Sequence, residues 1–173
     1  MLELYINSNM ESNEGSPKMS TATAAGQPLW FFVNLARVLV TPEQSDGSLG
    51  IVELTGTRGE MPPLHVHHRE DETIVVLEGE LTIFMPGQSL TLHAGDAAFA
   101  PKGIPHAYRV ESERARFLGV SNPAGLASFV LAASDPAEAN DLPPADRPVD
   151  MERLLAAAEA HGIEIVAPPG TTP

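Results

Sequence analysis

The sequence of 173 residues contains no cysteine, which excludes disulfide bonds and thiol catalysis. Basic residues are also scarce, since 10 Lys and Arg stand against 23 Asp and Glu and give a formal net charge of −13. Such a charge repels nucleic acids and anionic membranes, so neither is expected as a partner. No apolar run is long enough to cross a bilayer, and the N-terminus lacks the basic residues and cleavage pattern of a secretory signal. A cytoplasmic location is therefore expected.

Short segments of β type dominate the middle of the chain, which is long enough for one domain with a proper core. Alternating or β-branched apolar residues are separated by turn signals such as Pro86 and Gly87. The expected strands are 29–40, 49–55, 65–68, 73–78, 80–85, 89–93, 97–100, 107–110 and 116–120. Short strands with no helix between them indicate an all-β fold, and a jelly-roll β-barrel is the simplest choice.

Helical periodicity is expected only after the last of these strands. Asn122 and Pro123 are typical of a helix start, and this helix should end at Pro136. Asp150 should cap a second helix from Met151 to His161. The apolar stripes of the two helices would contain Leu126, Phe129, Val130 and Ala133, and Met151, Leu154, Leu155 and Ala158. These stripes predict short C-terminal helices that pack on the barrel.

Residues suited to metal coordination lie in two glycine-framed segments of the barrel region. Side chains alternate along a strand, so His65 and His67 point the same way, and a neighbouring strand can add Glu72. His106 lies in the second segment. Three neutral imidazoles and one carboxylate satisfy a divalent first-row metal, whereas Mg²⁺ or Ca²⁺ would need more oxygen ligands. We expect one ion per chain, with Fe, Mn, Ni, Co, Cu and Zn all compatible.

The other histidines fall outside this pattern. His68 directly follows His67 and should face the other side of the strand, while His93 precedes a turn and His161 lies at a helix end. All three are interpreted as solvated side chains. Asp71 is the nearest alternative carboxylate, and it should face away from the ion if its neighbour faces inward.

The spacing of the two segments resembles that of the cupin superfamily. From Gly59 to Gly79 the chain has a glycine, five residues, His-x-His, four residues, Glu, six residues and a glycine. From Gly95 to His106 it has a glycine, five residues, Pro-x-Gly, two residues and His. The second motif of the family ends on an Asn that is not a metal ligand, and this chain has Val110 there. The resemblance covers about residues 30 to 121 and implies a cupin jelly roll that holds a metal ion.

The segment from Pro62 to Glu72 looks like that of small single-domain cupins similar to quercetin dioxygenase. In those enzymes the metal binds an enolic oxygen, O₂ attacks the ring, and the glutamate ligand can accept the hydroxyl proton. The resemblance implies an O₂-dependent dioxygenase for a small enolic, phenolic or flavonol-like compound, with Glu72 as ligand and possible general base. Two alternatives stay open: a metal-dependent isomerase, decarboxylase or lyase, and a non-catalytic cupin that binds a small molecule.

The pocket walls can be predicted by counting along the strands. If His106 points inward, so does Tyr108; if Glu72 points inward, so do Ile74 and Val76. Further candidates are Met61, Phe99 and Phe117. The pocket should be mainly apolar, which suits a small apolar or aromatic substrate. Tyr108 is its clearest polar group that is not a ligand, and it is the second candidate catalytic residue beside Glu72.

Three regions are therefore expected: a flexible arm over residues 1–28, a cupin β-barrel over 29–121, and a helical extension over 122–173. The arm is polar, but residues 2–6 alternate and could form a strand that pairs with an exposed sheet edge of a second subunit. Cupin barrels commonly dimerise, so a homodimer is expected.

Overall fold

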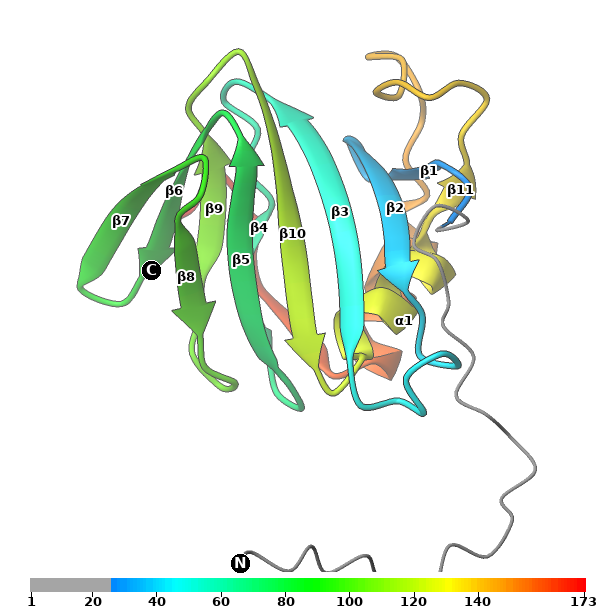
Figure 1. The fold of residues 1–173 in the computed structure, drawn as a ribbon, viewed down its shortest axis with the longest axis horizontal. Helices are drawn as coiled ribbons and strands as arrows, with labels where there is room; N and C mark the ends of the chain where they lie inside the picture. Colours follow the sequence, from blue (N-terminus) through cyan, green and yellow to red (C-terminus); the bar gives the residue numbers. More distant parts are fainter. Residues whose placement is uncertain (1–25) are drawn as a thin grey trace, which may run out of the picture.

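Antiparallel strands build the computed structural model of the chain, which describes residues 26–173 (Figure 1). The largest sheet contains, in spatial order, β11 (Asp135–Pro136), β1 (Leu29–Phe31), β2 (Asn34–Val40), β3 (Gly50–Thr57), β10 (Arg114–Asn122), β5 (Asp71–Glu78) and β8 (Ala97–Ala100). Two smaller sheets consist of β12 (Ile163–Pro169) with β4 (Pro63–His67), and of β7 (Gln88–His93), β6 (Glu80–Met85) and β9 (Ala107–Val110). A backbone bridge between His65 and His106 joins them into a second layer; in Figure 1, β4 lies behind β5 and β10, and β6, β7 and β9 lie to the left of β5.

The hydrophobic core lies between these layers. In β5 and β10 every second residue is buried, as expected for strands with one face toward a core. The largest fully buried apolar side chains are Phe117, Leu81, Ile83, Val52, Val76, Val110 and Val130. Burial of each such side chain stabilises the fold by roughly 1.5–3 kcal/mol. The prediction of an all-β jelly roll with short C-terminal helices is confirmed, although the strands of the described region form open sheets and not one closed barrel.

Two helices follow the jelly roll. Helix α1 (Gly125–Ala133) packs on β2, β3, β10 and helix α2 (Met151–Ala160). The predicted start of the first helix at Pro123 is wrong, because Asn122 is the last residue of β10 and its side chain donates to the carbonyl of Ser48. The predicted cap of the second helix is confirmed, since the Asp150 side chain accepts the N–H of Arg153 at 2.9 Å.

The C-terminal segment contains a strand in addition to the predicted helices. β12 pairs with β4, placing Ile163 opposite His67 and Ile165 opposite His65. The predicted stripe of the second helix is only partly buried: Leu154 and Ala158 are buried, whereas Met151 and Leu155 are 44% and 47% exposed. The segment 122–173 is thus mixed helix and strand. The arm predicted over residues 1–28 lies, apart from its last three residues, outside the described region.

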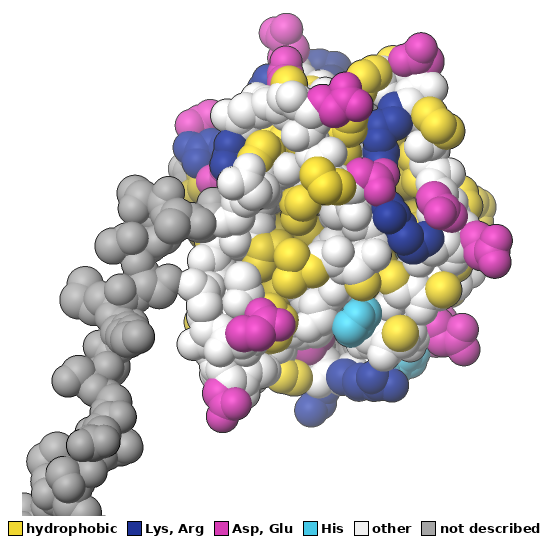
Figure 2. All heavy atoms as spheres, turned by 90° about the vertical axis from the view of Figure 1, so that its right-hand side faces the viewer, with side chains coloured by type: hydrophobic (Ala, Val, Ile, Leu, Met, Phe, Trp, Pro, Cys, Tyr) yellow, Lys and Arg dark blue, Asp and Glu magenta, His cyan; other side chains and the backbone are white. Residues whose placement is uncertain are grey.

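The surface combines charged and apolar areas. On the face in Figure 2, acidic and basic side chains surround a middle area where hydrophobic side chains reach the surface. Among the two helices of residues 26–173, neither has the length and apolar character needed to span a bilayer.

Candidate metal centre and cavity

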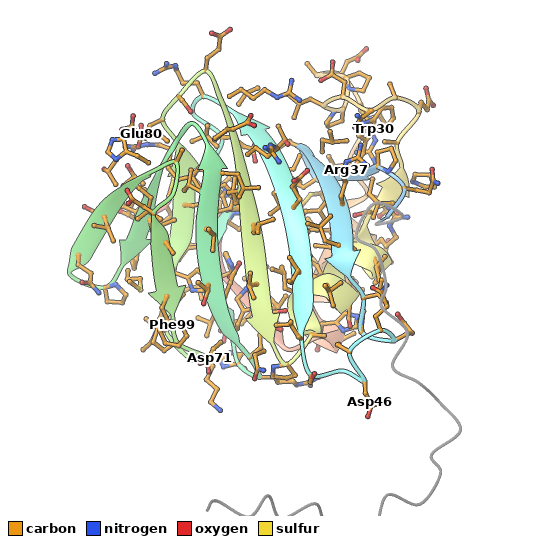
Figure 3. The ribbon with its side chains drawn as sticks, in the orientation of Figure 1. Trp30, Arg37, Asp46, Asp71, Glu80 and Phe99 are labelled. Atoms are coloured by element: carbon orange, nitrogen blue, oxygen red, sulfur yellow. The ribbon has the colours of Figure 1, made fainter. Side chains whose placement is uncertain are left out.

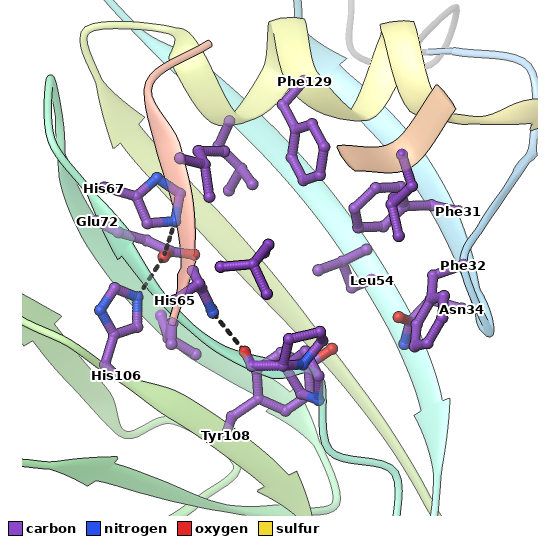
Figure 4. Close-up of a pocket in the computed structure, with 17 residues that line it drawn as sticks. Phe31, Phe32, Asn34, Leu54, His65, His67, Glu72, His106, Tyr108 and Phe129 are labelled. Atoms are coloured by element: carbon purple, nitrogen blue, oxygen red, sulfur yellow. Dashed lines mark hydrogen bonds and ion pairs between the residues drawn. The ribbon is translucent and has the colours of Figure 1, made fainter. Parts of the chain in front are cut away.

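The four side chains predicted to bind a metal ion lie together between the layers (Figure 4). β4 carries His65 and His67, and Glu72 is the second residue of β5. His106 immediately precedes β9 and exchanges backbone hydrogen bonds of 2.9 and 3.2 Å with His65. Each of the four side chains offers one ligand atom, and these atoms lie within 4.8 Å of one another. The cluster could therefore hold one ion.

Backbone carbonyls orient two of the imidazoles. The Nδ1–H of His65 donates to the carbonyl of Pro63 at 2.9 Å, and the Nδ1–H of His106 donates to that of Ile104 at 3.0 Å. A carbonyl can only accept, so Nδ1 carries the hydrogen in both rings. In the neutral form of each ring, Nε2 is left as the ligand atom.

The third imidazole is oriented by a carboxylate and not by a backbone carbonyl. The Nδ1–H of His67 donates to Oε1 of Glu70 at 2.6 Å, and both side chains are buried. On the other side of the ring, Nε2 of His67 lies 3.3 Å from Oε2 of Glu72, and Nε2 of His106 lies 3.1 Å from the same oxygen. Sequence reasoning did not identify Glu70.

The electrostatics of the cluster favour cation binding. Burial and the neighbouring His106 and His67 lower the pKa of His65 to about 3, so this ring is neutral near neutral pH. Burial alone would raise the pKa of Glu72, but the hydrogen bond from His106 and the charges of the histidines lower it to about 2. Burial lowers the pKa of His106, but the hydrogen bond and charge of Glu72 outweigh burial and raise it. A bound cation would compete with a second proton on His106 for the attraction of Glu72.

A glycine of β10 makes room for the carboxylate of Glu72. A Cβ at Gly119 would lie 3.1 Å from Oε1 of Glu72 and 2.7 Å from the side chain of Leu126. Any larger residue at this position would push Glu72 toward the histidines or move α1. Gly119 is therefore a further residue on which the site depends.

The cluster lines a cavity with largely apolar walls. Of the predicted wall residues, Ile74 and Tyr108 line it. The prediction for Phe99 is wrong, because this ring is 55% exposed at the edge strand β8 (Figure 3). Distant segments supply much of the remaining wall, including Phe31, Leu126, Phe129, Leu154, Ile163 and Ile165. In Figure 4, Phe129 points from α1 into this space.

A second polar group lies in the wall at Tyr108 and Asn34. The Tyr108 hydroxyl donates to Oε1 of Glu60 at 3.4 Å, and the Asn34 side-chain amide donates to the same oxygen. Burial raises the pKa of Glu60 to about 6, although its hydrogen bonds act in the opposite direction. Burial and the charge of Glu60 raise the pKa of Tyr108 well above its ordinary value, so the phenol keeps its proton. The sequence indicated Tyr108 but neither of its partners.

The raised pKa of Glu60 predicts a pH-dependent stability. The folded state disfavours ionised Glu60, so ionisation of this carboxyl lowers the stability of the protein. This loss is absent below pH 4.5, grows as the pH rises and is complete above about pH 6. Relative to a Glu60→Gln variant, wild-type protein should lose up to about 2 kcal/mol of unfolding free energy across this range. Chemical denaturation of both proteins at several pH values measures the difference. A constant difference would contradict the assignment.

The remaining histidines lie outside the cluster. Nε2 of His68 pairs with Glu164 at 2.7 Å on the surface, where the two side chains are 51% and 59% exposed. His93 lies beside Asp96 and is also exposed. His161 is the C-terminal cap residue of α2. None of these three residues reaches the cavity wall.

Comparison with known proteins relates the chain to a protein family. Residues 54–121 match the family model described as a cupin domain. Quercetin 2,3-dioxygenase of Bacillus subtilis (strain 168) is 28% identical over 134 residues, which are 78% of this chain and 40% of that protein. The chain spans less than half the length of the curated relatives that it matches, 40% and 49%.

Solved structures show the same fold. A predicted oxalate decarboxylase from Thermotoga maritima superposes with a TM-score of 0.54 at 18% identity, over 61% of this chain and 99% of that chain. An RmlC-like cupin from Shewanella frigidimarina NCIMB 400 gives a TM-score of 0.50 at 20% identity, over 57% of this chain and 85% of that chain. At these identities the likeness concerns the fold alone.

Proposed function

We propose that this chain, a member of the cupin superfamily, is a metal-dependent dioxygenase acting on a small enolic, phenolic or flavonol-like compound. All four candidate ligands line one apolar cavity, and this arrangement is the main support for the proposal. A substrate in that cavity would be shielded from water and in reach of the ligand cluster. The similarity to quercetin 2,3-dioxygenase supports the same class of reaction.

The proposed metal ligands are His65, His67, Glu72 and His106. Three imidazole nitrogens and one carboxylate oxygen suit Fe²⁺, Mn²⁺, Ni²⁺, Co²⁺, Cu²⁺ or Zn²⁺. When bound, such an ion supplies a Lewis acid and, if it is redox-active, electrons for the activation of O₂. The neutral His65 and the ionised Glu72 are already in the protonation states that coordination requires.

The residues of the cavity define the proposed substrate. An aromatic ring would pack against the apolar wall, for example against Phe31 and Phe129. Ionised Glu72 would accept the proton of an enolic or phenolic hydroxyl at the cluster. Tyr108 already donates to Glu60, so its oxygen can accept a hydrogen bond from a second hydroxyl of the substrate. Polar groups at two ends of an apolar body match a flavonol-like compound.

Turnover with and without oxygen tests this function. Metal-loaded protein should consume O₂ and substrate in equal amounts with quercetin or a related enol, and should put both atoms of labelled O₂ into the product. Equal turnover without oxygen would contradict the dioxygenase and indicate an isomerase, decarboxylase or lyase. Saturable binding without turnover would indicate a binding protein. The homodimer and the cytoplasmic location expected from the sequence stay predictions.

A further inference from the structure

Glu70 is a buried acidic residue that the proposed function does not use. Its side chain is 2% exposed, and both of its carboxylate oxygens accept hydrogen bonds. Oε1 accepts the Nδ1–H of His67 at 2.6 Å, and Oε2 accepts the backbone N–H of Leu126 at 2.9 Å. One side chain therefore connects a candidate metal ligand to the first turn of α1.

The start of α1 is fitted to this carboxylate. Its N-cap residue, Ala124, makes no side-chain cap, so Glu70 supplies from a distant loop the acceptor that the helix lacks. The first helical residue is Gly125, where a Cβ would lie 2.5 Å from Oε2 of Glu70. A negative charge also interacts favourably with the N-terminal end of a helix.

Helix α1 in turn forms part of the cavity wall. Leu126 and Phe129 line the cavity, and Figure 4 shows Phe129 pointing from α1 into it. Leu126 and the carboxylate of Glu72 both lie next to Gly119, where a Cβ would come within 2.7 Å of the first and 3.1 Å of the second. A displacement of this turn would alter the wall and the ligand cluster together.

We propose that Glu70 is a positioning residue that couples the metal site to helix α1. It fixes the ring of His67 with Nε2 toward the cluster, and it anchors the turn of α1 that closes the cavity. Binding of a cation to His67 should therefore stabilise the start of α1, and an anchored α1 should strengthen cation binding by the same factor. The inference rests on the proposed metal site and adds to it a link between metal occupancy and the cavity wall.

Glu70→Gln breaks this link without removing the side chain. A Gln amide has one oxygen, so it cannot accept from both His67 and Leu126. If the NH₂ group faces Leu126, two donors oppose each other at the helix start. If it faces His67, Nδ1 must accept, and the ring hydrogen moves to Nε2, the atom that faces the cluster. Either arrangement weakens the site or the helix anchor.

The first test is the affinity of metal-free protein for Zn²⁺, measured by competition with a chelator. Glu70→Gln should bind Zn²⁺ at least about tenfold more weakly than wild type. Glu164→Gln is the matched control, because Glu164 also bonds a histidine, His68, at 2.7 Å but on the surface. The control should keep wild-type affinity. Equal affinity of Glu70→Gln and wild type overturns the inference.

The second test uses wild-type protein and so does not depend on the folding of a variant. Zn²⁺ should slow hydrogen exchange of the Leu126 amide by about fivefold or more. The Arg153 amide should not respond, although a carboxylate, Asp150, caps it at 2.9 Å in α2. A Leu126 amide that is insensitive to bound Zn²⁺ overturns the coupling alone. Wild-type protein that binds no Zn²⁺ overturns the proposed metal site as well.

Discussion

A His106→Ala variant is expected to retain less than about a tenth of the metal content of wild-type protein. His106 supplies one of the three imidazole nitrogens and also holds Glu72 at 3.1 Å. The backbone bridge between His106 and His65 does not involve the imidazole, so alanine should preserve the strand arrangement. Both proteins are loaded with one metal, freed of excess ion and measured by mass spectrometry for metal per chain.

The matched control is His93→Ala, which removes an exposed imidazole from the end of β7. This variant should keep the wild-type metal content, and circular dichroism should show that both variants are folded. One ion per chain in the His106→Ala protein would rule out the proposed ligand set.

The second large effect is expected for Glu72→Gln after its metal has been restored to full occupancy. Gln keeps the shape and an oxygen donor, but it loses the charge and nearly all basicity. If Glu72 accepts the substrate proton in the limiting step, the catalytic rate should fall by about a hundredfold or more. Steady-state O₂ uptake by equally metallated proteins measures the change.

Asp71→Asn is the control for this substitution, since it neutralises the adjacent carboxylate. Asp71 is the first residue of β5, next to Glu72, but its side chain is not part of the cluster and accepts the backbone N–H of Lys102 at 2.9 Å, which Asn can also do (Figure 3). The control should keep both metal and rate. Near-normal turnover by fully metallated Glu72→Gln would show that Glu72 serves as a ligand only.

Strand alternation made much of the site predictable from sequence. It places His65 and His67 on one face of β4, and it correctly placed Tyr108 in the cavity wall. It failed for Phe99, because β8 is an edge strand of the large sheet and its outward face meets solvent. The alternation of Ile163 and Ile165 was a signal for β12, but helical periodicity just before it favoured a helical interpretation of the whole segment.

The partners of the site residues were not predictable in the same way, because they depend on tertiary contacts. Glu60 and Tyr108 are 48 residues apart in the sequence, and Glu70 and Leu126 are 56 residues apart. No local pattern encodes such separations. For Glu70 a weak signal exists, since it lies two residues before Glu72 in a row of three acidic residues, and the middle one faces away.

The most direct test of the central claim is the position of the metal in a crystal of metal-loaded protein, located by anomalous diffraction. One anomalous peak per chain is expected, within coordination distance of Nε2 of His65, His67 and His106 and of the Glu72 carboxylate. A chain whose peak lies elsewhere, for example at the surface pair of His68 and Glu164, with none at the cluster, would contradict it.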